Sequence, residues 1–200
     1  MIRFESNCEV SQELKDKYGF KTVHVKEFTM DSKKEFIKQC DEALDTGQTI
    51  LPITIDSYGG SVYALLGMFD YLQNVEDAEV VTICDGVAMS CGAALFTCGK
   101  RRFLSQNGTV LFHDMSWVSI GKDTDIQSDA KNAERLKKIL YHTISTNLGH
   151  DKDWLLKNLM DRGNADWFLN SKECKQLNVA TKIGLPKLVT RFEMIKELRV

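Results

Sequence analysis

Ser90 is the only serine in the run ICDGVAMSCGAALFTCG, residues 83–99, where almost every other side chain is small or apolar. Such a run predicts a buried helix that packs closely against its neighbours, with Ser90 near the start of that helix. The N–H groups in the first turn of a helix have no partners within it, and the helix dipole is positive there. These donors suit a developing oxyanion, so Ser90 is a candidate nucleophile. The alternative is a serine that only caps the helix or fills space.

His113 is a candidate general base. It follows the apolar stretch TVLF, which predicts a strand, at the point where a polar loop begins. Loops at strand ends often carry site residues, although a single histidine there can also be structural. Asp114 comes next but would point to the opposite face of the strand, which makes it a poor orienting partner. The other histidines, His24, His142 and His150, are predicted to be solvated.

The stretch DSYGGS, residues 56–61, offers a backbone donor. Two glycines at the end of an apolar strand allow positive φ angles and a close approach of the main chain to a substrate. The alternative is an ordinary tight turn before a helix. The serine, the histidine and the glycines thus form a candidate site whose parts come from three separate segments.

Composition narrows the class of protein. The chain has 200 residues, 43% of them hydrophobic and 27% charged, which suits one globular domain or a domain with an appendage. A formal net charge of −2 gives no electrostatic case for binding nucleic acid or an anionic membrane. No stretch approaches about 18 consecutive apolar residues, so no transmembrane helix is expected. The charged start, MIRFESNCEVSQELKDKYG, lacks the apolar core of a signal peptide, which predicts a soluble intracellular protein.

The cysteines are scattered along the chain, with no C-x-x-C pair and no histidine cluster nearby. Zinc or redox chemistry therefore has little support. Several of the cysteines lie in apolar segments, where free cysteine packs as a small hydrophobe. Reduced thiols in a cytosolic compartment are expected.

Alternating strands and helices predict an α/β protein. Apolar strand-like runs alternate with amphipathic stretches of helical period, and the short loops between them favour a parallel sheet covered by helices. Asn107-Gly108, between two strand-like runs, predicts a β-hairpin, and Ser171 is predicted to cap a late helix. The expected elements are strands over 21–29, 49–56 and 79–84, helices over 32–45, 62–72 and 86–99, a long helix over about 123–148, and a shorter helix around Trp154 and Leu159.

Three segments, in this order, resemble the ClpP family of self-compartmentalised serine peptidases: ITIDSYGGSVYALLGMFDYL, VVTICDGVAMSCGAALFTCGKRRF and GTVLFHDM. The family carries an apolar strand into an N-S-P-G-G turn, then a helix with I-Y-D, a T-x-x-x-G-x-A-A-S-M-G-A segment and a strand ending in I-H-Q. Farther on, GKDTDI and DWFLNSKECKQLNVATKIG are similar to the family's G-x-A-x-D-I and D-x-F-(L/M)-(S/T)-A-x-E-A-x-x-Y-G-L-(I/V)-D. The resemblance runs from about residue 21 to residue 184.

The resemblance implies roles for five positions. Ser90 matches the family's nucleophile, His113 its general base, and Asp166 the carboxylate that orients the imidazole. Gly60 and Cys91 match the two positions whose backbone N–H groups form the family's oxyanion hole. The chain order Ser, His, Asp differs from that of chymotrypsin, subtilisin and the α/β-hydrolases, which argues against those folds. The nearby competitors of Asp166 are Asp151, Asp153 and Asp161.

Several residues depart from the family pattern. The N-S-P-G-G turn is D-S-Y-G-G at 56–60, and the Q-P-x-G-G that follows the family's histidine is D-M-S-W-V at 114–118. Trp117 and Val118 replace glycines and are expected to stiffen this segment and narrow the space beside the substrate. Met89 replaces a small residue just before the nucleophile. These changes bear on substrate preference and on contacts between rings, and they leave all three triad positions filled.

The resemblance also implies a fold and an assembly. The fold would be ClpP/crotonase-like, an α/β spiral of ββα units with a protruding handle helix over about 123–148, within a peptidase domain over 21–184. Residues 1–20 would be an N-terminal arm or axial loop, and residues 185–200 a C-terminal tail. The implied function is endopeptidase cleavage of unfolded polypeptides inside a homo-oligomeric barrel of two stacked heptameric rings. A hexameric AAA+ unfoldase of the Clp type would deliver substrates and use ATP, whereas the peptidase itself would need no cofactor and no metal. The expected compartment is the cytoplasm, a plastid stroma or the cytoplasm of a phage-infected host.

Two other functions compete with this one. A crotonase-type enzyme that acts on an acyl-CoA uses a similar pair of backbone donors, but it would not need Ser90 and His113 together. A non-catalytic ring subunit in a mixed barrel is the second alternative. Such paralogues usually lack a triad member, whereas all three positions are filled here.

Overall fold

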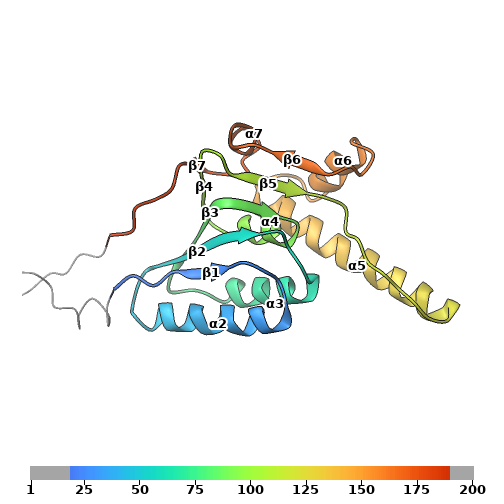
Figure 1. The fold of residues 1–200 in the computed structure, drawn as a ribbon, viewed down its shortest axis with the longest axis horizontal. Helices are drawn as coiled ribbons and strands as arrows, with labels where there is room; N and C mark the ends of the chain where they lie inside the picture. Colours follow the sequence, from blue (N-terminus) through green and yellow to red (C-terminus); the bar gives the residue numbers. More distant parts are fainter. Residues whose placement is uncertain (1–18, 190–200) are drawn as a thin grey trace, which may run out of the picture.

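The computed structural model describes residues 19–189, which form one seven-stranded, mostly parallel sheet with helices packed against it (Figure 1). The strand order is β1-β2-β3-β4-β7, while β5 also pairs with β3, and β6 pairs with β5 in the antiparallel direction. The predicted α/β fold class is confirmed. The elements are β1 (Val23–Val25), α2 (Met30–Leu44), β2 (Ile50–Ser57), α3 (Val62–Gln73), β3 (Glu79–Met89), α4 (Cys91–Phe96), β4 (Arg101–Leu104), β5 (Thr109–Phe112), α5 (Asp123–Asn147), α6 (Trp154–Met160), β6 (Trp167–Leu169), α7 (Ser171–Gln176) and β7 (Lys182–Ile183).

One hydrophobic core joins the sheet to its helices. Most of β2 and β3 is buried, as expected for parallel strands covered by other elements. Helices α2 and α3 pack side by side, and Figure 1 shows them below β1. α2 begins with a capping box, because the Thr29 hydroxyl accepts from Ser32 N at 3.0 Å and the Ser32 hydroxyl accepts from Thr29 N at 2.8 Å. The helices predicted over 32–45 and 62–72 are confirmed, with small shifts at their ends.

Strand β3 changes its partner on one side halfway along its length. Residues 81–84 pair with β4 and residues 87–89 pair with β5, both in the parallel direction. On the other side β3 pairs with β2, but the register shifts at the end of β2. There the Asp56 carboxylate accepts a hydrogen bond from Val87 N at 3.1 Å. Such a bulge strengthens the local twist and redirects the end of the strand, which here leads directly to Ser90.

The predicted hairpin at Asn107-Gly108 is wrong. β4 and β5 do not pair with each other, since both run parallel to β3. The turn between them is closed by a hydrogen bond from Gly108 N to Ser105 O at 3.0 Å, and it moves the chain from one half of β3 to the other without reversing it. Asn-Gly chemistry favours a tight turn, but tertiary context decides which partners the flanking strands take.

The helix predicted over 86–99 begins later than expected. Residues 86–89 belong to β3, and α4 covers only Cys91–Phe96. The small, apolar composition signals burial, which a central strand and a core helix share, so periodicity could not separate the two. Ser90 is therefore the residue at which a strand turns into a helix.

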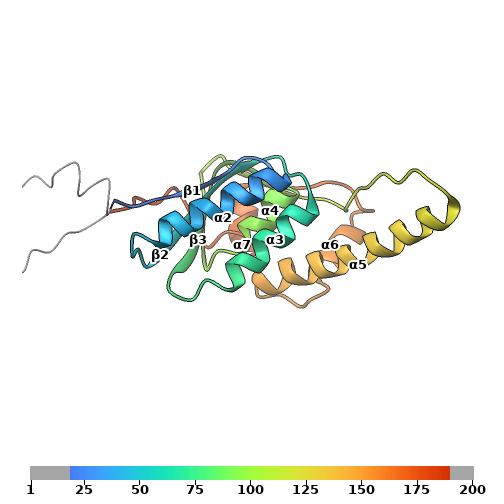
Figure 2. The same ribbon diagram turned by 90° about the horizontal axis from the view of Figure 1, so that it is seen from below.

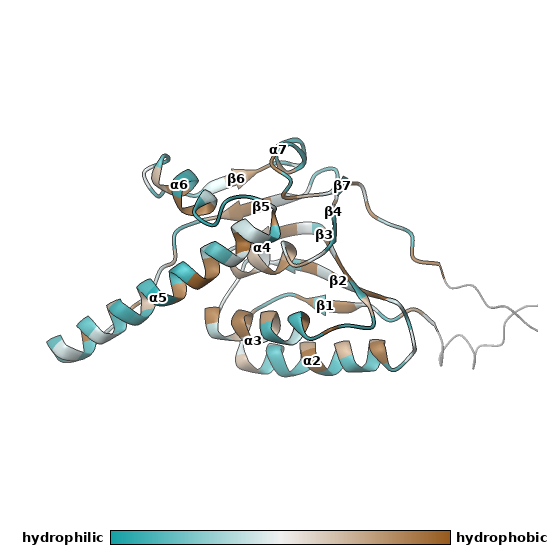
Figure 3. Cartoon of the chain, turned by 180° about the vertical axis from the view of Figure 1, so that it is seen from behind, coloured by the Kyte–Doolittle hydropathy of each residue, from teal (hydrophilic) through white to brown (hydrophobic). Residues whose placement is uncertain are grey.

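Helix α5, close to the range predicted for the long helix, projects away from the sheet (Figures 1 and 2). Residues 121–130 are all exposed, and Figure 3 shows hydrophilic residues over much of this projecting half. The second half packs against the core through Leu136, Leu140 and Ile144. No helix within residues 19–189 has the length and apolarity that a membrane span requires.

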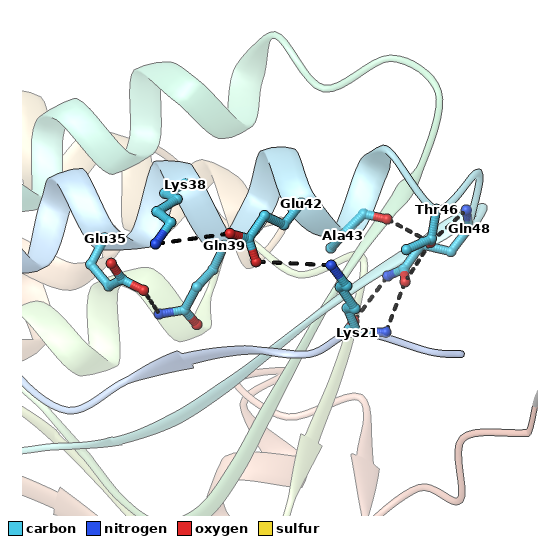
Figure 4. A network of polar contacts seen from close by, with 8 residues as sticks. All are labelled: Lys21, Glu35, Lys38, Gln39, Glu42, Ala43, Thr46 and Gln48. Atoms are coloured by element: carbon cyan, nitrogen blue, oxygen red, sulfur yellow. Dashed lines mark hydrogen bonds and ion pairs between the residues drawn. The ribbon is translucent and has the colours of Figure 1, made fainter. Parts of the chain in front are cut away.

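A glutamine fastens the chain before β1 to the loop after α2. Gln48 Oε1 accepts from Lys21 N, and Gln48 Nε2 donates to Lys21 O, both at 3.0 Å (Figure 4). The ion pairs of Lys21 and Lys38 with Glu42 are 3.9 Å long and exposed, so they contribute little to stability.

The predicted arm over 1–20, apart from its last two residues, and the predicted tail beyond residue 189 lie outside the described residues.

A buried arginine fastens the C-terminal segment to β4. The Arg102 guanidinium donates to the carbonyl oxygens of Gly99, Asn178 and Val179 at 2.7 to 2.9 Å. This segment continues into β7, which pairs with β4.

The predicted cap of α7 is off by one residue. Asn170 is the N-cap and forms a capping box with Glu173, because an amide oxygen in that position reaches the first-turn N–H, whereas Ser171 is already helical.

Replacing Asp56 tests the bulge in β3. We expect Asp56→Leu to lower the free energy of unfolding by about 0.5–1.5 kcal/mol, because Val87 N–H loses its acceptor. Asp56→Asn keeps an acceptor and stays within about 0.5 kcal/mol of the wild type. Urea denaturation at one protein concentration measures both. Asp85→Leu is the matched control, since Asp85 is an exposed acid in the same bulge. An equal loss in Asp56→Leu and Asp85→Leu would contradict this role.

Candidate active site

Four of the five residues implied by the family resemblance meet at one cavity of about 80 Å³. Ser90, His113, Gly60 and Cys91 all line it, and they follow the ends of β3, β5 and β2. These strands are parallel, so their carboxyl ends lie at the same edge of the sheet, which is where α/β proteins form their sites. The rest of the wall is largely apolar and includes Val62, Phe112, Leu140, Tyr141 and Ile144.

Ser90 has a strained backbone at the strand–helix junction. Its φ is +54° and its ψ is −119°, a combination that non-glycine residues rarely adopt. Ser90 N donates to Leu111 O and Ser90 O accepts from Ala94 N, both at 3.0 Å, so β5 and α4 hold the residue from two sides. A Cβ on Gly59 would lie 2.7 Å from Ser90 Cβ, so the two segments approach this closely only with glycine there. A sharp strand-to-helix turn of this kind is typical of serine nucleophiles.

The main chain of Gly60 is turned toward Cys91. Phe28 N donates to Gly59 O at 3.3 Å, and Ser61 N donates to Phe28 O at 2.7 Å. Because both bonds belong to the neighbours of Gly60, its own N–H and C=O face away from Phe28. The Cys91 thiol donates to Gly60 O at 3.2 Å. The N–H of Gly60 therefore lies on the Cys91 side, beside the first N–H of α4, which has no acceptor within its helix.

The Cys91 thiol does not compete with Ser90 as a nucleophile. Burial raises the pKa of Cys91 to about 11, so the thiol stays protonated near neutral pH. Only a thiolate attacks readily. The oxyanion-hole role implied for Cys91 needs its main-chain N–H and not its side chain, so the replacement of the family's methionine leaves that donor in place.

His113 and Asp166 lie just beyond the paired ends of β5 and β6. The two strands are antiparallel, with Phe112 opposite Trp167, and one further step in this register would set His113 against Asp166. Residues opposite one another in such a pair have Cβ atoms about 4.5–5.5 Å apart. Asp166 is exposed and does not line the cavity. Within the described residues no hydrogen bond joins His113 to Ser90 or to Asp166, and catalytic hydrogen bonds often tighten only when substrate binds.

The competing carboxylates have other positions. Asp153 lies 3.3 Å from His142 Nε2, and Asp161 is the C-cap of α6. Asp151 precedes α6, where its carbonyl oxygen accepts from Trp154 N at 2.8 Å. None of the three is adjacent to β6, the strand that pairs with β5, whereas Asp166 directly precedes it. Strand register therefore favours Asp166 over its competitors.

The prediction of solvated histidines holds for His24 and in part for His142, whose side chain is 43% exposed, but it is wrong for His150. The His150 ring stacks on Trp154 with centroids 4.2 Å apart, and its Nε2 lies 3.0 Å from Leu177 O. His142 is half buried beside Asp153. Both are covered because α6 folds back onto the end of α5, a contact that helical periodicity alone does not reveal.

A polar cluster beside His113 is not apparent from the sequence. Asp114 Oδ1 accepts from Lys137 Nζ at 2.7 Å, from Tyr141 OH at 2.7 Å and from Met115 N at 2.9 Å. Tyr141 OH also lies 3.4 Å from His113 O. We call Asp114, Lys137 and Tyr141 the Asp114 clamp. It fixes the segment after β5 to α5, and it confirms that Asp114 is not the partner of His113. The only sequence signal is the four-residue spacing of Lys137 and Tyr141 on one helix face.

The clamp keeps Asp114 ionised and Tyr141 protonated. Burial by itself would raise the pKa of the Asp114 carboxyl, but hydrogen bonds from Lys137, Tyr141 and Met115 and the positive charge of Lys137 hold that pKa below its usual range. Burial, followed by the hydrogen bond to Asp114 and the charge of that carboxylate, raises the pKa of Tyr141 well above its usual value. Tyr141 is therefore a stable hydrogen-bond donor in the wall of the cavity. No group of three His, Cys, Asp or Glu side chains in residues 19–189 is arranged to hold a metal ion.

The mostly parallel sheet and the projecting α5 agree with the ClpP-like fold implied by the sequence. Residues 20–186 match the family model described as Clp protease, so the chain belongs to the Clp protease family. The resemblance inferred from the motifs around Ser90 and His113 is confirmed, and with it the ClpP-like fold.

Its relatives include ATP-dependent Clp protease proteolytic subunits at modest identity. The subunit from Bacteroides fragilis is 28% identical over 181 residues, which cover 88% of this chain and 83% of the relative. Proteolytic subunit 3 from Parasynechococcus marenigrum is 34% identical over 145 residues, or 70% of each chain. The subunit from Porphyromonas gingivalis is 29% identical over 175 residues, which cover 86% of this chain and 76% of the relative. This chain is a divergent member of the family.

The Asp114 clamp predicts a pH-dependent contribution to stability. We expect Asp114→Asn to lower the free energy of unfolding by about 1–2 kcal/mol at neutral pH, because the charge-assisted hydrogen bonds are lost. The pKa of Asp114 is lower in the folded than in the unfolded state. The ionised Asp114 carboxylate therefore contributes its full stabilisation above pH 3.9, which is about the pKa of Asp in the unfolded chain. This stabilisation is lost as the pH falls through the lower pKa that Asp114 has in the folded protein. Urea denaturation of both proteins over this pH range measures it.

The control for this prediction is Asp41→Asn, because Asp41 accepts from Tyr71 OH at 2.6 Å away from the cavity. Amide exchange at Met115 is expected to speed up only in Asp114→Asn. A stability difference that does not change with pH, or equal exchange in the two variants, would show that the clamp does not hold this segment.

Proposed function

We propose that the chain is a serine-type endopeptidase, the proteolytic subunit of an ATP-dependent Clp-like protease that degrades unfolded polypeptides. The observation that carries this proposal is the cavity that Ser90 and His113 share with Gly60 and Cys91, whose main-chain N–H groups would be the donors of the oxyanion hole. The first pair supplies a nucleophile and its base, and the second pair supplies an oxyanion hole. A crotonase-type acyl-CoA enzyme would need the second pair but not the first.

The proposed reaction follows the logic of a serine triad. Ser90 Oγ attacks the scissile carbonyl carbon while His113 takes the hydroxyl proton. The oxyanion that forms accepts hydrogen bonds from Gly60 N and Cys91 N, each worth about 2.7–4 kcal/mol in the transition state. The C–N bond then breaks, the amine leaves with the proton from His113, and an acyl ester remains on Ser90. Water then attacks that ester while His113 takes one of its protons. The bond between the acyl carbon and Ser90 Oγ breaks, His113 returns the proton to Oγ, and the new carboxylate is released.

Asp166 would orient His113 during these steps. A carboxylate beside the imidazole holds the tautomer whose other nitrogen faces the serine, and it stabilises the imidazolium that forms. Support for this role is the β5–β6 register, which would set the two residues opposite one another just beyond the end of the strand pair. A short movement of the exposed Asp166 side chain would complete the hydrogen bond.

The proposed assembly is a homo-oligomeric barrel of two stacked heptameric rings, fed by a hexameric AAA+ unfoldase of the Clp type. The relatives are named as subunits of an ATP-dependent protease, and ATP would be used by the unfoldase, so the peptidase itself needs no cofactor. Ile120 is 93% exposed, which suits burial between subunits. The described cysteines are free, in keeping with the reducing cytoplasm.

Covalent labelling tests the triad. A fluorophosphonate probe is expected to label Ser90, and Ser90→Ala and His113→Ala are expected to abolish labelling because one lacks the nucleophile and the other its base. Asp166→Asn should slow labelling by about 10³-fold, since the imidazole loses its orienting carboxylate. Mass spectrometry of the labelled peptide at successive times measures the labelling rate of the wild type and of each variant.

Asp161→Asn is the matched control for Asp166→Asn, because Asp161 is a nearby exposed acid that does not face β5. It should be labelled at the wild-type rate. Undiminished labelling of His113→Ala would refute the triad. A wild-type protein that is never labelled would favour the non-catalytic subunit or the acyl-CoA enzyme instead.

Native mass spectrometry tests the assembly. We expect a mass of seven or fourteen chains, since the exposed apolar side chains near the start of α5 need to be covered. Ile120→Asp should shift the distribution toward single rings or free chains, whereas Met160→Asp, an exposed apolar residue at the end of α6, should leave it unchanged. A mass of one chain for the wild type would contradict the barrel.

A further inference from the structure

A second cavity of about 300 Å³ adjoins the active-site cavity. The two cavities share Gly60, Val62, Met115 and Ser116, but neither Ser90 nor His113 lines the second. It lies between the turn after β2, the segment after β5 and the middle of α5. A substrate held at the active site therefore has continuous access to this space.

Polar and apolar groups share the wall of this cavity about equally. Tyr63, Trp117, Val118 and Leu136 belong to its apolar part, and the two aromatic side chains remain about half exposed. Tyr63 OH accepts from Asn132 Nδ2 at 2.7 Å, which ties α3 to α5 across the cavity. A partly exposed aromatic ring offers an apolar surface to an aliphatic chain and a π face to a cation.

Asp129 is the one charged residue in the lining. Its Oδ2 accepts from the Ser119 hydroxyl at 2.5 Å, and no lysine, arginine or histidine within residues 19–189 forms an ion pair with it. A cavity with an apolar side and a carboxylate that has no ion-pair partner among the described residues matches a side chain with an aliphatic stem and a cationic head.

We propose that this cavity is a substrate subsite that selects a lysine or arginine side chain. We call it the Asp129 subsite and define it by Tyr63, Trp117, Val118, Asp129 and Leu136. The stem of the substrate residue packs on Trp117 and Leu136, and its ammonium or guanidinium group reaches the Asp129 carboxylate. The inference rests on the proposed function, because it concerns a polypeptide bound at that active site.

The selected residue precedes the scissile bond. His113 returns its proton to the leaving amine, so the part of the substrate after the scissile bond lies toward His113. The Asp129 subsite touches Gly60, on the oxyanion side, and does not touch His113. The backbone of an extended polypeptide substrate rises about 3.3 Å per residue. A long side chain on one of the few residues before the scissile bond therefore reaches the cavity.

Quenched fluorescent peptides with one varied position test this selection. Lysine, arginine, norleucine and glutamate are placed in turn at each position before the scissile bond, and kcat/KM is measured. Norleucine is the matched comparison for lysine because it keeps the aliphatic stem and lacks the charge. We expect lysine or arginine to exceed norleucine by about three- to tenfold at one position, and to lose this lead at high salt.

Three variants test whether the selection arises in this cavity. Asp129→Asn should bring the lysine-to-norleucine ratio close to one. Asp125→Asn, an exposed acid one turn earlier on α5 and outside the cavity lining, should leave the ratio as in the wild type. Trp117→Ala should weaken the binding of both peptides, since each loses the wall that supports its stem.

Binding to Ser90→Ala separates this inference from the proposed function. Fluorescence anisotropy gives the affinity of the lysine and norleucine peptides for a protein that cannot cleave them. A lysine preference that disappears with Asp129→Asn supports the subsite even if the wild type is neither labelled nor active, in which case the proposed function alone fails. Equal affinities for the two peptides would overturn the subsite, whether or not the wild type cleaves them.

Discussion

Strand β3 has to pair with three other strands, and the candidate site depends on how it does so. β2 runs along one side of it, while β4 and then β5 share the other side. The change of partner coincides with the bulge that the Asp56 carboxylate stabilises, and the redirected strand ends at Ser90. Ser90 lies beside the end of β5, where Leu111 O accepts a hydrogen bond from Ser90 N. Two residues after Leu111 comes His113, which lines the same cavity as Ser90. A straight, evenly paired β3 would not bring these groups together.

The strained conformation of Ser90 needs support from its surroundings, and the small residues around it make that support possible. All six residues of α4 are buried, so the helix that follows Ser90 is held in the core. A Cβ on Gly92 would lie 3.1 Å from Ser57 O, and one on Gly59 would collide with Ser90 itself. The burial of α4 stabilises the helix far more than one strained residue costs, which is about 1–3 kcal/mol. The composition of residues 83–99 thus has a structural reason that is independent of any reaction.

Helix α5 connects the site to the surface that faces other subunits in the proposed barrel. Its second half supplies Tyr141 and Leu140 to the active-site cavity and Lys137 to the Asp114 clamp. Its middle lines the second cavity, and its exposed first turns lie beside the apolar side chains of 117–120. The segment after β5 is held to α5 at both ends, by Asp114 and by the hydrogen bond from Ser119 to Asp129. A shift of α5 in an assembly would therefore move the walls of both cavities together.

The sequence by itself determined the fold class, the long helix, and four residues that share a cavity, because apolar periodicity and ordered motifs are local signals. It also singled out Asp166, and the β5–β6 register adds a reason to prefer this carboxylate to Asp153 or Asp161, because Asp166 directly precedes the strand that pairs with β5. It misjudged Asn107-Gly108 and the strand before Ser90, since a turn signal and a buried run do not say which partner a strand will take. Only the tertiary structure decided the Asp114 clamp and the second cavity. The clamp joins Asp114 to residues of α5 more than twenty positions later, and the second cavity joins the turn after β2 to the same helix. Only the packing of α5 against the strand ends brings these residues together.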